Sequence, residues 1–265
     1  GLAFSGGADS SAALSVMPGN TVPIFMNRPM KRWSMYDSDA PLSNCKLLGE
    51  IGYDVQIIDC DVEYLRKPVG FPSDLAHAIP SILLAEVLGL DSIAFGTVLE
   101  SAYGIGHEKY KNYPEGAHRR FFGSLLNAVG LELCLPVGGI SEVGTLIINH
   151  KSPLGEFSQS CIRGKKGNPC SKCWKCFRKG MLSSALLGTE FDIKNYTVKN
   201  KEVKEKLSAY PISHENVLVF SIQNLKNRED KNLQLLRDRI DSGLDLDFLK
   251  RWYSPSLELV PEKYR

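Results

Sequence analysis

Long apolar runs are missing from this sequence, and their absence excludes the simplest membrane architecture. No run approaches the roughly 18 apolar residues of a membrane-spanning helix, and no charged-then-apolar stretch marks a secretory signal. A large net charge is missing too: the formal value of +2 does not by itself argue for nucleic-acid binding. We therefore expect an ordinary soluble protein, cytoplasmic by default and without a membrane partner.

The length and the pattern of the chain predict an α/β fold. A chain of 265 residues is long enough for one large domain and an appendage. Short apolar runs alternate with helix-like stretches at intervals of about 30 residues, which predicts βαβ units and a parallel sheet with helices on both faces. The sequence opens at Gly1, only four residues before its first motif, whereas a first strand usually needs about five or six residues. We therefore expect the natural chain to extend upstream.

The expected elements follow from the apolar pattern and its stops. Strands are expected at 2–4, 21–26, 54–58, 92–96 and 132–135. Helices are expected at 11–16, 41–51, 76–88, 119–129 and 142–149. The helix at 76–88 is expected to be buried because it is apolar on most sides. Residues 102–118 are expected to form a loop or lid. Ligands of such sheets bind at the carboxyl ends of the strands, so the loops after Phe4, Met26 and Phe95 should share one crevice.

The stretch Ser5-Gly6-Gly7-Ala8-Asp9-Ser10-Ser11 lies between the first expected strand and the first expected helix. Two adjacent glycines let the backbone approach an anion closely, and the hydroxyl and N–H groups at the helix start supply donors. This combination suits a phosphate or pyrophosphate, whereas the alternative is a glycine turn with a serine cap. It is not a Walker A loop, because no Gly-Lys-Ser/Thr follows the glycines.

Four of the seven cysteines form a second motif, C-x8-C-x2-C-x2-C, at Cys161, Cys170, Cys173 and Cys176. Four thiolates can close a tetrahedron around Zn²⁺ and leave no open position, so we expect a structural zinc. An iron–sulfur cluster and disulfide or persulfide chemistry are the alternatives. Lysines and arginines between the ligands offset the charge of the thiolates and offer contacts to a polyanion. The other cysteines, Cys45, Cys60 and Cys134, are expected in the core.

The first motif resembles the pyrophosphate loop (SGGxDS) of the N-type ATP pyrophosphatase superfamily. The second, Ser160-Cys161 followed by Pro169-Cys170 and the remaining cysteines up to Arg178, resembles the zinc site of the 7-cyano-7-deazaguanine synthase family within it. The likeness covers roughly residues 1 to 188 and includes Tyr113-Pro114-Glu115. It implies a Rossmann-like, adenine nucleotide alpha hydrolase-like fold that cleaves ATP between its α and β phosphates and transfers AMP to a substrate.

The resemblance also implies roles for single residues. ATP would be held by Ser5, Gly6, Gly7, Asp9, Ser10 and Ser11, together with Gly96 and Thr97 after the fourth strand. Ser5 and Asp9 would act in catalysis, Asp9 by organising Mg²⁺ and pyrophosphate. The alternatives are helix capping for Asp9 and a plain strand-end turn for Gly96 and Thr97.

The acceptor half of the sequence departs from that family. Ala8 stands where glutamine is usual, and the strings at 27–33, 71–74 and 141–143 differ from the family's substrate motifs. We therefore expect an ATP-dependent C–N ligase that adenylates a carboxylate or amide-like oxygen for attack by ammonia or an amine. A modifier of tRNA, DNA or a protein carrier is one alternative, and a catalytically degenerate nucleotide-binding or assembly module is another. Expected partners are ATP and a small-molecule acceptor, with a homodimer as a further option.

The remaining predictions concern domains and isolated residues. Residues 1–195, including the zinc loop 161–176, are expected to form the ATP-binding domain, and residues 196–265 a helical C-terminal extension. The apolar residues of 233–264 are expected to pack against the main domain, with a partner-binding surface as the alternative. Arg119 and Arg120 would either neutralise a leaving group or carboxylate substrate, or lie on a solvated helix face. His107 and His118 receive no role.

Overall fold

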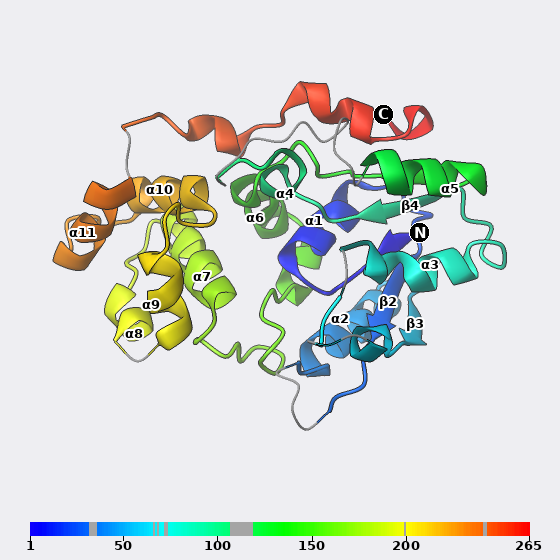
Figure 1. Cartoon of the computed structure of the whole chain (residues 1–265), viewed down its shortest axis with the longest axis horizontal. Coiled ribbons are helices and arrows are strands. Elements are labelled where there is room, and N and C mark those ends of the chain that lie inside the picture. The colour runs from blue at the N-terminus through cyan, green and yellow to red at the C-terminus, as the bar shows by residue number, and fades with distance from the viewer. Residues whose placement is uncertain are drawn as a thin grey trace.

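A five-stranded parallel sheet forms the centre of one half of the molecule (Figure 1). The computed structural model describes residues 1–31, 36–65, 67, 69–71, 74–106, 119–198, 200–240 and 243–265. The strands are β1 (Leu2–Ala3), β2 (Pro23–Asn27), β3 (Gln56–Asp59), β4 (Ser92–Phe95) and β5 (Glu132–Cys134). Their order is β3-β2-β1-β4-β5, and every neighbouring pair is parallel. The predicted α/β class and parallel sheet are confirmed.

Helices cover both faces of the sheet because successive strand residues point to opposite sides. Leu2 and Ala94 belong to one core, together with residues of α1 (Ala8–Val16) and α2 (Asp39–Glu50). Ala3 and Ile93 belong to the other core, together with residues of the 3₁₀ helix η2 (Asp74–Ala78), α4 (Leu99–Tyr103) and α5 (Ser124–Ala128). The predicted helix at 119–129 is present as a π-helical turn, η4 (Arg119–Gly123), that continues into α5.

The predicted buried helix at 76–88 is wrong in extent and in burial. The α-helix there, α3, spans only Ile79–Leu84, and Leu83 and Val87 are 72% and 82% exposed. Only Pro80 and Ser81 of α3 are buried, because η2, α4 and α5 already fill that face of the sheet. Because apolar residues occur on every side of 76–88, the sequence did not indicate which face of this stretch would be buried. The first part of the predicted loop at 102–118 belongs to α4, and residues 107–118 lie outside the described part of the chain.

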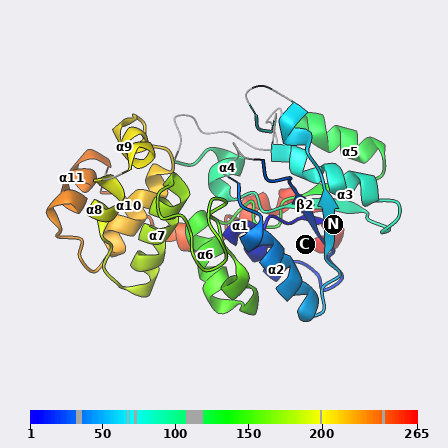
Figure 2. The ribbon, with the colours of Figure 1, turned by 90° about the horizontal axis from the view of Figure 1, so that it is seen from below.

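A separate helical body follows the sheet, and a helix between them joins the two (Figures 1 and 2). It consists of α7 (Trp174–Leu187), α8 (Ile193–Thr197), α9 (Lys201–Ser208), α10 (Glu215–Asn224) and α11 (Lys231–Ile240). Phe177 and Phe220, both fully buried, lie in its core. The joining helix is α6 (Glu142–Lys151), which contacts α1 on one side and α7 on the other. The Ser5–Ser11 stretch at the start of α1 and the last cysteines at the start of α7 therefore belong to two helices that both pack against α6.

The C-terminal segment returns from the helical body to the sheet (Figure 1). Leu259, at the end of the 3₁₀ helix η7 (Ser254–Leu259), is fully buried in a sheet-face core, and its carbonyl accepts the N–H of Leu135 at 2.9 Å. Helix α7 instead shares its core with the helices beyond residue 196. The predicted boundary at 195/196 thus lies inside one packed body. None of the helices in the described ranges has the length and apolar character needed to cross a membrane.

Candidate functional site

The Ser5–Ser11 loop lies at the carboxyl end of β1, which pairs with β2 on one side and β4 on the other. In this strand order the connections leave in opposite directions from β1 and β4, which is where open α/β sheets bind ligands. The loop turns sharply at Gly6, whose φ of +71° favours glycine. A Cβ on Gly6 would lie 3.1 Å from the Cα of Pro41, so α2 also restricts this position to glycine.

Gly96 holds the end of β4 against the start of α1. A Cβ added to Gly96 would lie 2.7 Å from both the carbonyl carbon of Asp9 and the amide nitrogen of Ser10. Real Cβ atoms do not approach backbone this closely, so any side chain here would push the loop away. The structure thus places Gly96 against the loop, and Thr97 follows it directly in the chain; nucleotide binding by both residues stays a prediction.

Hydroxyl and N–H groups are gathered at the start of α1. The Oγ atoms of Ser5 and Ser10 lie 3.1 Å apart, and Ser10 Oγ donates to the carbonyl of Gly7 at 3.0 Å. Gly7 is the N-cap and no side chain caps the helix, so the capping alternative for Asp9 does not apply. The first-turn N–H groups have no partner inside the helix, and that of Ala8 donates to Ser160 Oγ at 3.3 Å.

Asp9 contacts residues from two other helices. Its Oδ1 accepts a hydrogen bond from Thr145 Oγ1 at 3.0 Å and lies 2.9 Å from Lys179 Nζ. The Lys179 side chain is 12% exposed and that of Asp9 is 32% exposed. Burial opposes the charge of Lys179, but Asp9 and Glu142 outweigh this effect and raise its pKa. The carboxylate at the loop is therefore paired with a cation that remains charged.

A buried ion-pair network continues from Lys179 to Glu142. Glu142 accepts two hydrogen bonds from Arg178, at 2.9 and 2.6 Å, and its carboxylate lies 3.3 Å from Lys179 Nζ and 3.5 Å from His214 Nε2. Burial opposes its ionisation, but Lys179, Arg178 and His214 outweigh burial and lower the pKa of Glu142 to about 2. This network joins α6 to α7 behind the loop.

A second buried carboxyl, Glu100, lies beside Glu142. It accepts the backbone N–H of Glu142 at 3.0 Å and the side-chain amide of Asn216 at 2.9 Å. Burial, reinforced by the charge of Glu142, raises the pKa of Glu100 to about 7. Two adjacent carboxyls are thus shifted in opposite directions, because the cations surround only Glu142.

The four predicted metal ligands come together. The Sγ atoms of Cys161, Cys170, Cys173 and Cys176 lie within 4.8 Å of one another, and those of Cys170 and Cys176 are 3.8 Å apart. A tetrahedron with Zn–S bonds of about 2.3 Å has edges of roughly 3.8 Å, so the cluster fits zinc. Backbone N–H groups donate to three of the sulfurs at 3.4 to 3.5 Å, which favours the thiolate form that binds metal.

Gln159, two residues before Cys161, forms hydrogen bonds both to the loop and to the turn that follows Cys161. The backbone N–H of Gln159 donates to the carbonyl of Gly6 at 2.9 Å, and its side chain donates to the carbonyls of Gly164 and Lys165. The same Gly6 carbonyl accepts the side-chain amide of Asn44 at 3.0 Å. Gln159 is therefore a direct link between the loop and the turn that carries the metal ligands.

A cavity of about 360 Å³ separates the start of α1 from the cysteines. Its lining includes Ala8, Ser160, Cys161, Cys176 and Lys179, from both motifs. The two motifs that the sequence places about 150 residues apart therefore face a common space. A ligand in this cavity would touch the first turn of α1 and the metal-bearing segment together.

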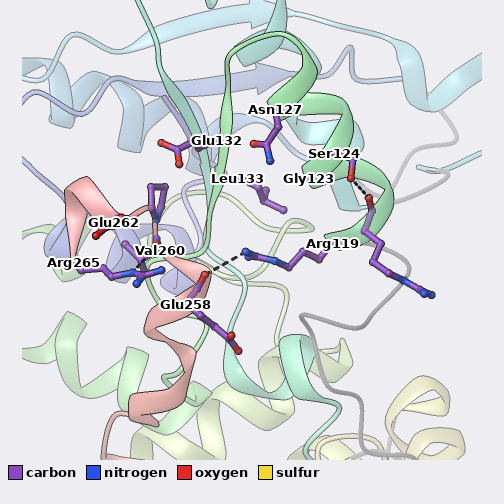
Figure 3. A pocket seen from close by; sticks show the side chains of 12 residues that line it. Arg119, Gly123, Ser124, Asn127, Glu132, Leu133, Glu258, Val260, Glu262 and Arg265 are labelled. Carbon is purple, nitrogen blue, oxygen red and sulfur yellow. Dashed lines mark hydrogen bonds between the residues drawn. The ribbon is translucent and has the colours of Figure 1, made fainter.

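Other candidate residues lie away from this site. Arg119 and Arg120 line a different cavity of about 460 Å³, where Arg119 donates to the carbonyl of Glu258 at 3.3 Å (Figure 3). Neither arginine reaches the loop, whose residues take no part in that lining. His107, His118 and Tyr113–Glu115 lie outside the described residues, as do Arg32–Trp33 and Pro72–Ser73 of the departing strings.

The three remaining cysteines divide between core and half-buried positions. Cys45 and Cys134 are buried as predicted, and burial raises the pKa of each thiol to about 12. Cys60 is only half-buried, so the prediction of a core position is wrong for this residue. It follows β3, the edge strand of the sheet, where fewer neighbours cover a side chain.

Sequence reasoning did not assign roles to Ser160, Thr145, Glu142 or Lys179. The contacts of Ser160, Thr145 and Lys179 with the start of α1 span 136 to 170 residues of chain, and no local pattern reports such pairs. Ser160 and Lys179 did carry a signal, since one precedes the first cysteine ligand and the other follows the last one by three residues. Glu100 carried none.

These features define an α/β protein with a parallel sheet, an anion-suited loop at its switch point and a four-cysteine centre. Residues 121–265 match a family model described as a family of unknown function, DUF6395. The chain belongs to this family. The match contains the four cysteines, Glu142 and Lys179, whereas the Ser5–Ser11 loop lies before it. No curated protein and no solved structure matches the chain.

Proposed function

We propose that this protein is an ATP-dependent ligase that cleaves ATP between the α and β phosphates and transfers AMP to an acceptor. The observation that carries the proposal is the Ser5–Ser11 loop at the carboxyl end of β1, at the switch point of the sheet. A loop of this composition in this position presents hydroxyls, N–H groups and a helix N-terminus to one anion. Pyrophosphate is the anion that the sequence resemblance indicates.

The charges around the loop support a pyrophosphate leaving group. Lys179 neutralises the carboxylate of Asp9 in the first turn of α1, and the helix dipole adds a partial positive charge. Such fixed charges stabilise the negative charge that develops on a departing pyrophosphate. Catalysis would then depend on positioning and electrostatics, without a covalent intermediate on a side chain.

Asp9 would hold Mg²⁺ if the ion accompanies the nucleotide. Both contacts of Asp9 within the described residues use Oδ1, which leaves Oδ2 as a hard oxygen ligand of the type that Mg²⁺ prefers. The ion would supply further charge for the leaving group. Ser5 and Ser10 would contact the phosphate oxygens through their hydroxyls.

Zinc in the four-cysteine site would be structural. Its four sulfur ligands complete the coordination shell and leave no position for a substrate. Its function would be to fix the segment beside the loop, which is also linked to the loop by the hydrogen bond from the Gln159 N–H to the carbonyl of Gly6. The acceptor in this proposal is a carboxylate or amide-like group attacked by ammonia or an amine after adenylation.

A nucleic-acid acceptor is the second candidate. Lys165, Lys172 and Lys175 are exposed around the cysteines and form a basic surface next to the proposed ATP site. Binding of tRNA or DNA that weakens steeply with added salt would favour this acceptor, since phosphate contacts release counterions.

Product analysis tests the proposed reaction. Incubation with ATP, Mg²⁺ and candidate acids should release AMP and pyrophosphate, whereas consistent release of ADP and phosphate would refute the mechanism. The Ser5→Ala/Asp9→Ala double variant should lose turnover. The matched control, Ser124→Ala/Asp247→Ala, removes the same groups at exposed positions and should keep it. Tight ATP binding without turnover for any acceptor would instead indicate a nucleotide-binding module.

A further inference from the structure

Two residues from the cysteine segment contact the first two residues of α1. Ser160 Oγ accepts the N–H of Ala8 at 3.3 Å, and Lys179 Nζ lies 2.9 Å from Asp9 Oδ1. Ala8 and Asp9 are adjacent, so both contacts act on one helical turn, at the part of the loop where an anion would bind. The Ser160 contact fixes the position of the Ala8 N–H group, and the Lys179 contact fixes and neutralises the Asp9 carboxylate.

Each of these residues is placed by cysteine ligands. Ser160 directly precedes Cys161, and Lys179 lies on α7, whose N-cap is Cys173 and whose first turn contains Cys176. The four sulfurs therefore join the short segment carrying Ser160 to the helix carrying Lys179.

Regular backbone structure contributes little to this junction. Between residues 158 and 173 the secondary structure consists of turns, bends and one isolated bridge, Lys165 to Asn168. A metal ion bound by all four cysteines would join the two ends of this stretch, in addition to hydrogen bonds such as those of Gln159 to Gly6, Gly164 and Lys165. Where a metal replaces missing backbone structure, its binding energy becomes local folding energy.

The charge balance gives Lys179 a specific task. Glu142 already has Arg178 as a bidentate partner, with both side chains no more than 6% exposed. Among the described residues, Lys179 is the cation that Asp9 contacts, and it is held between Asp9 and Glu142. Displacing Lys179 would leave the Asp9 carboxylate at the loop without its counter-charge, where it would repel a phosphate.

We propose that Ser160 and Lys179 are positioning residues for pyrophosphate binding, and that metal in the four-cysteine site sets the affinity of the Ser5–Ser11 loop by holding both in place. This inference rests on the proposed function. Ser160 acts through the N–H of Ala8, and Lys179 acts through the carboxylate of Asp9. Metal loss would release both residues. The N–H groups at the start of α1 would then lose their fixed position, and the Asp9 carboxylate would lose the positive charge of Lys179.

Titration calorimetry with Mg²⁺ and inorganic pyrophosphate on the full chain tests this inference. Zinc-loaded protein is compared with protein whose metal was removed by a chelator that is then dialysed away. We expect metal removal, Ser160→Ala and Lys179→Met each to weaken pyrophosphate binding by about tenfold or more, since each removes a charge-assisted contact or its support. Ser160→Thr and Lys179→Arg should recover most of the affinity.

Controls separate positioning from folding. Ser160→Ala and Lys179→Met should retain the zinc content and far-ultraviolet circular dichroism of the parent protein. Ser124→Ala, at the exposed start of α5, and Lys204→Met, on the exposed side of α9, should bind pyrophosphate normally. If Lys179→Met fails to fold, Ser160→Ala and the comparison of the two metal states still decide.

Two negative results are distinguishable. If zinc-loaded parent protein binds no pyrophosphate, the proposed function fails and the inference fails with it. If the parent binds pyrophosphate and its affinity is unchanged by metal removal, Ser160→Ala and Lys179→Met, the proposed function stands and this inference is overturned.

Discussion

Lys179 Nζ lies 2.9 Å from Asp9 Oδ1, although 170 positions separate the two residues. The contact joins the helix that follows the candidate anion loop to the helix that begins at the cysteine cluster. Lys179 also lies 3.3 Å from the buried Glu142 carboxylate. A continuous set of ion pairs therefore connects the loop to the helix that begins at the cysteine cluster.

Glu142→Gln should destabilise the protein strongly. The substitution leaves the buried Arg178 without its carboxylate and removes one of the two carboxylates beside Lys179, and breaking a buried pair typically costs about 3–5 kcal/mol of unfolding free energy. Urea unfolding measures the change. Glu50→Gln removes an exposed partner of Lys46 and should cost less than about 1 kcal/mol. Equal losses for the two variants would show that the network does not contribute to stability.

Glu100 should make the protein less stable as the pH rises from about 4.5 to about 7. Its pKa is raised from an ordinary 4.5 to about 7 by burial, so the folded state keeps a proton that the unfolded chain loses in this window. The loss is on the order of 3 kcal/mol and is complete above the folded-state pKa. Urea unfolding at pH 5 and pH 8 should show a smaller decrease for Glu100→Gln than for the parent. An identical decrease would contradict the assignment.

Gly96→Ala should disturb the loop. Its Cβ would lie 2.7 Å from the backbone of Asp9 and Ser10, and backbone cannot move aside cheaply. We expect lower stability in thermal unfolding together with weaker pyrophosphate binding. Gly49→Ala in α2 is the matched control, because its Cβ would meet no atom within 4 Å and alanine favours a helix by up to about 1 kcal/mol. A Gly96→Ala protein that matches the parent in both measurements would show that the close approach is unimportant.

Metal analysis should find one zinc ion per chain and no stoichiometric iron. Cys170→Ser removes one of four ligands and should lose the metal and lower the thermal unfolding temperature. Cys60→Ser replaces a half-buried cysteine outside the cluster and should retain the zinc. Iron in place of zinc, or full zinc retention by Cys170→Ser, would contradict the structural zinc site.

The sequence was sufficient for the sheet and for the two motifs. Alternating apolar strands and helices report local periodicity, which is why β1 to β5 were placed close to their observed positions. Glycine and serine at Ser5–Ser11, and the spacing of the four cysteines, are also local signals. The four-cysteine cluster was therefore predictable, and anion binding by Ser5–Ser11 stays a prediction.

The contacts between the motifs were not predictable in the same way. Lys179 reaches Asp9 only because α6 sits between α1 and α7, and this packing depends on side chains far apart in the sequence. The predicted burial of α3 was wrong for a related reason: its apolar residues show no periodicity that indicates which side packs against another element. The boundary near residue 196 was placed by a change in composition, whereas the core there is formed by α7 together with later helices.

A crystal structure of the zinc-loaded protein with Mg²⁺ and the non-hydrolysable analogue α,β-methylene-ATP tests the central claim most directly, because it needs no knowledge of the acceptor. We expect the β and γ phosphates at the start of α1, in contact with the hydroxyls of Ser5 and Ser10, with Asp9 facing the ion. A nucleotide bound elsewhere, or with its triphosphate directed away from this loop, would contradict it.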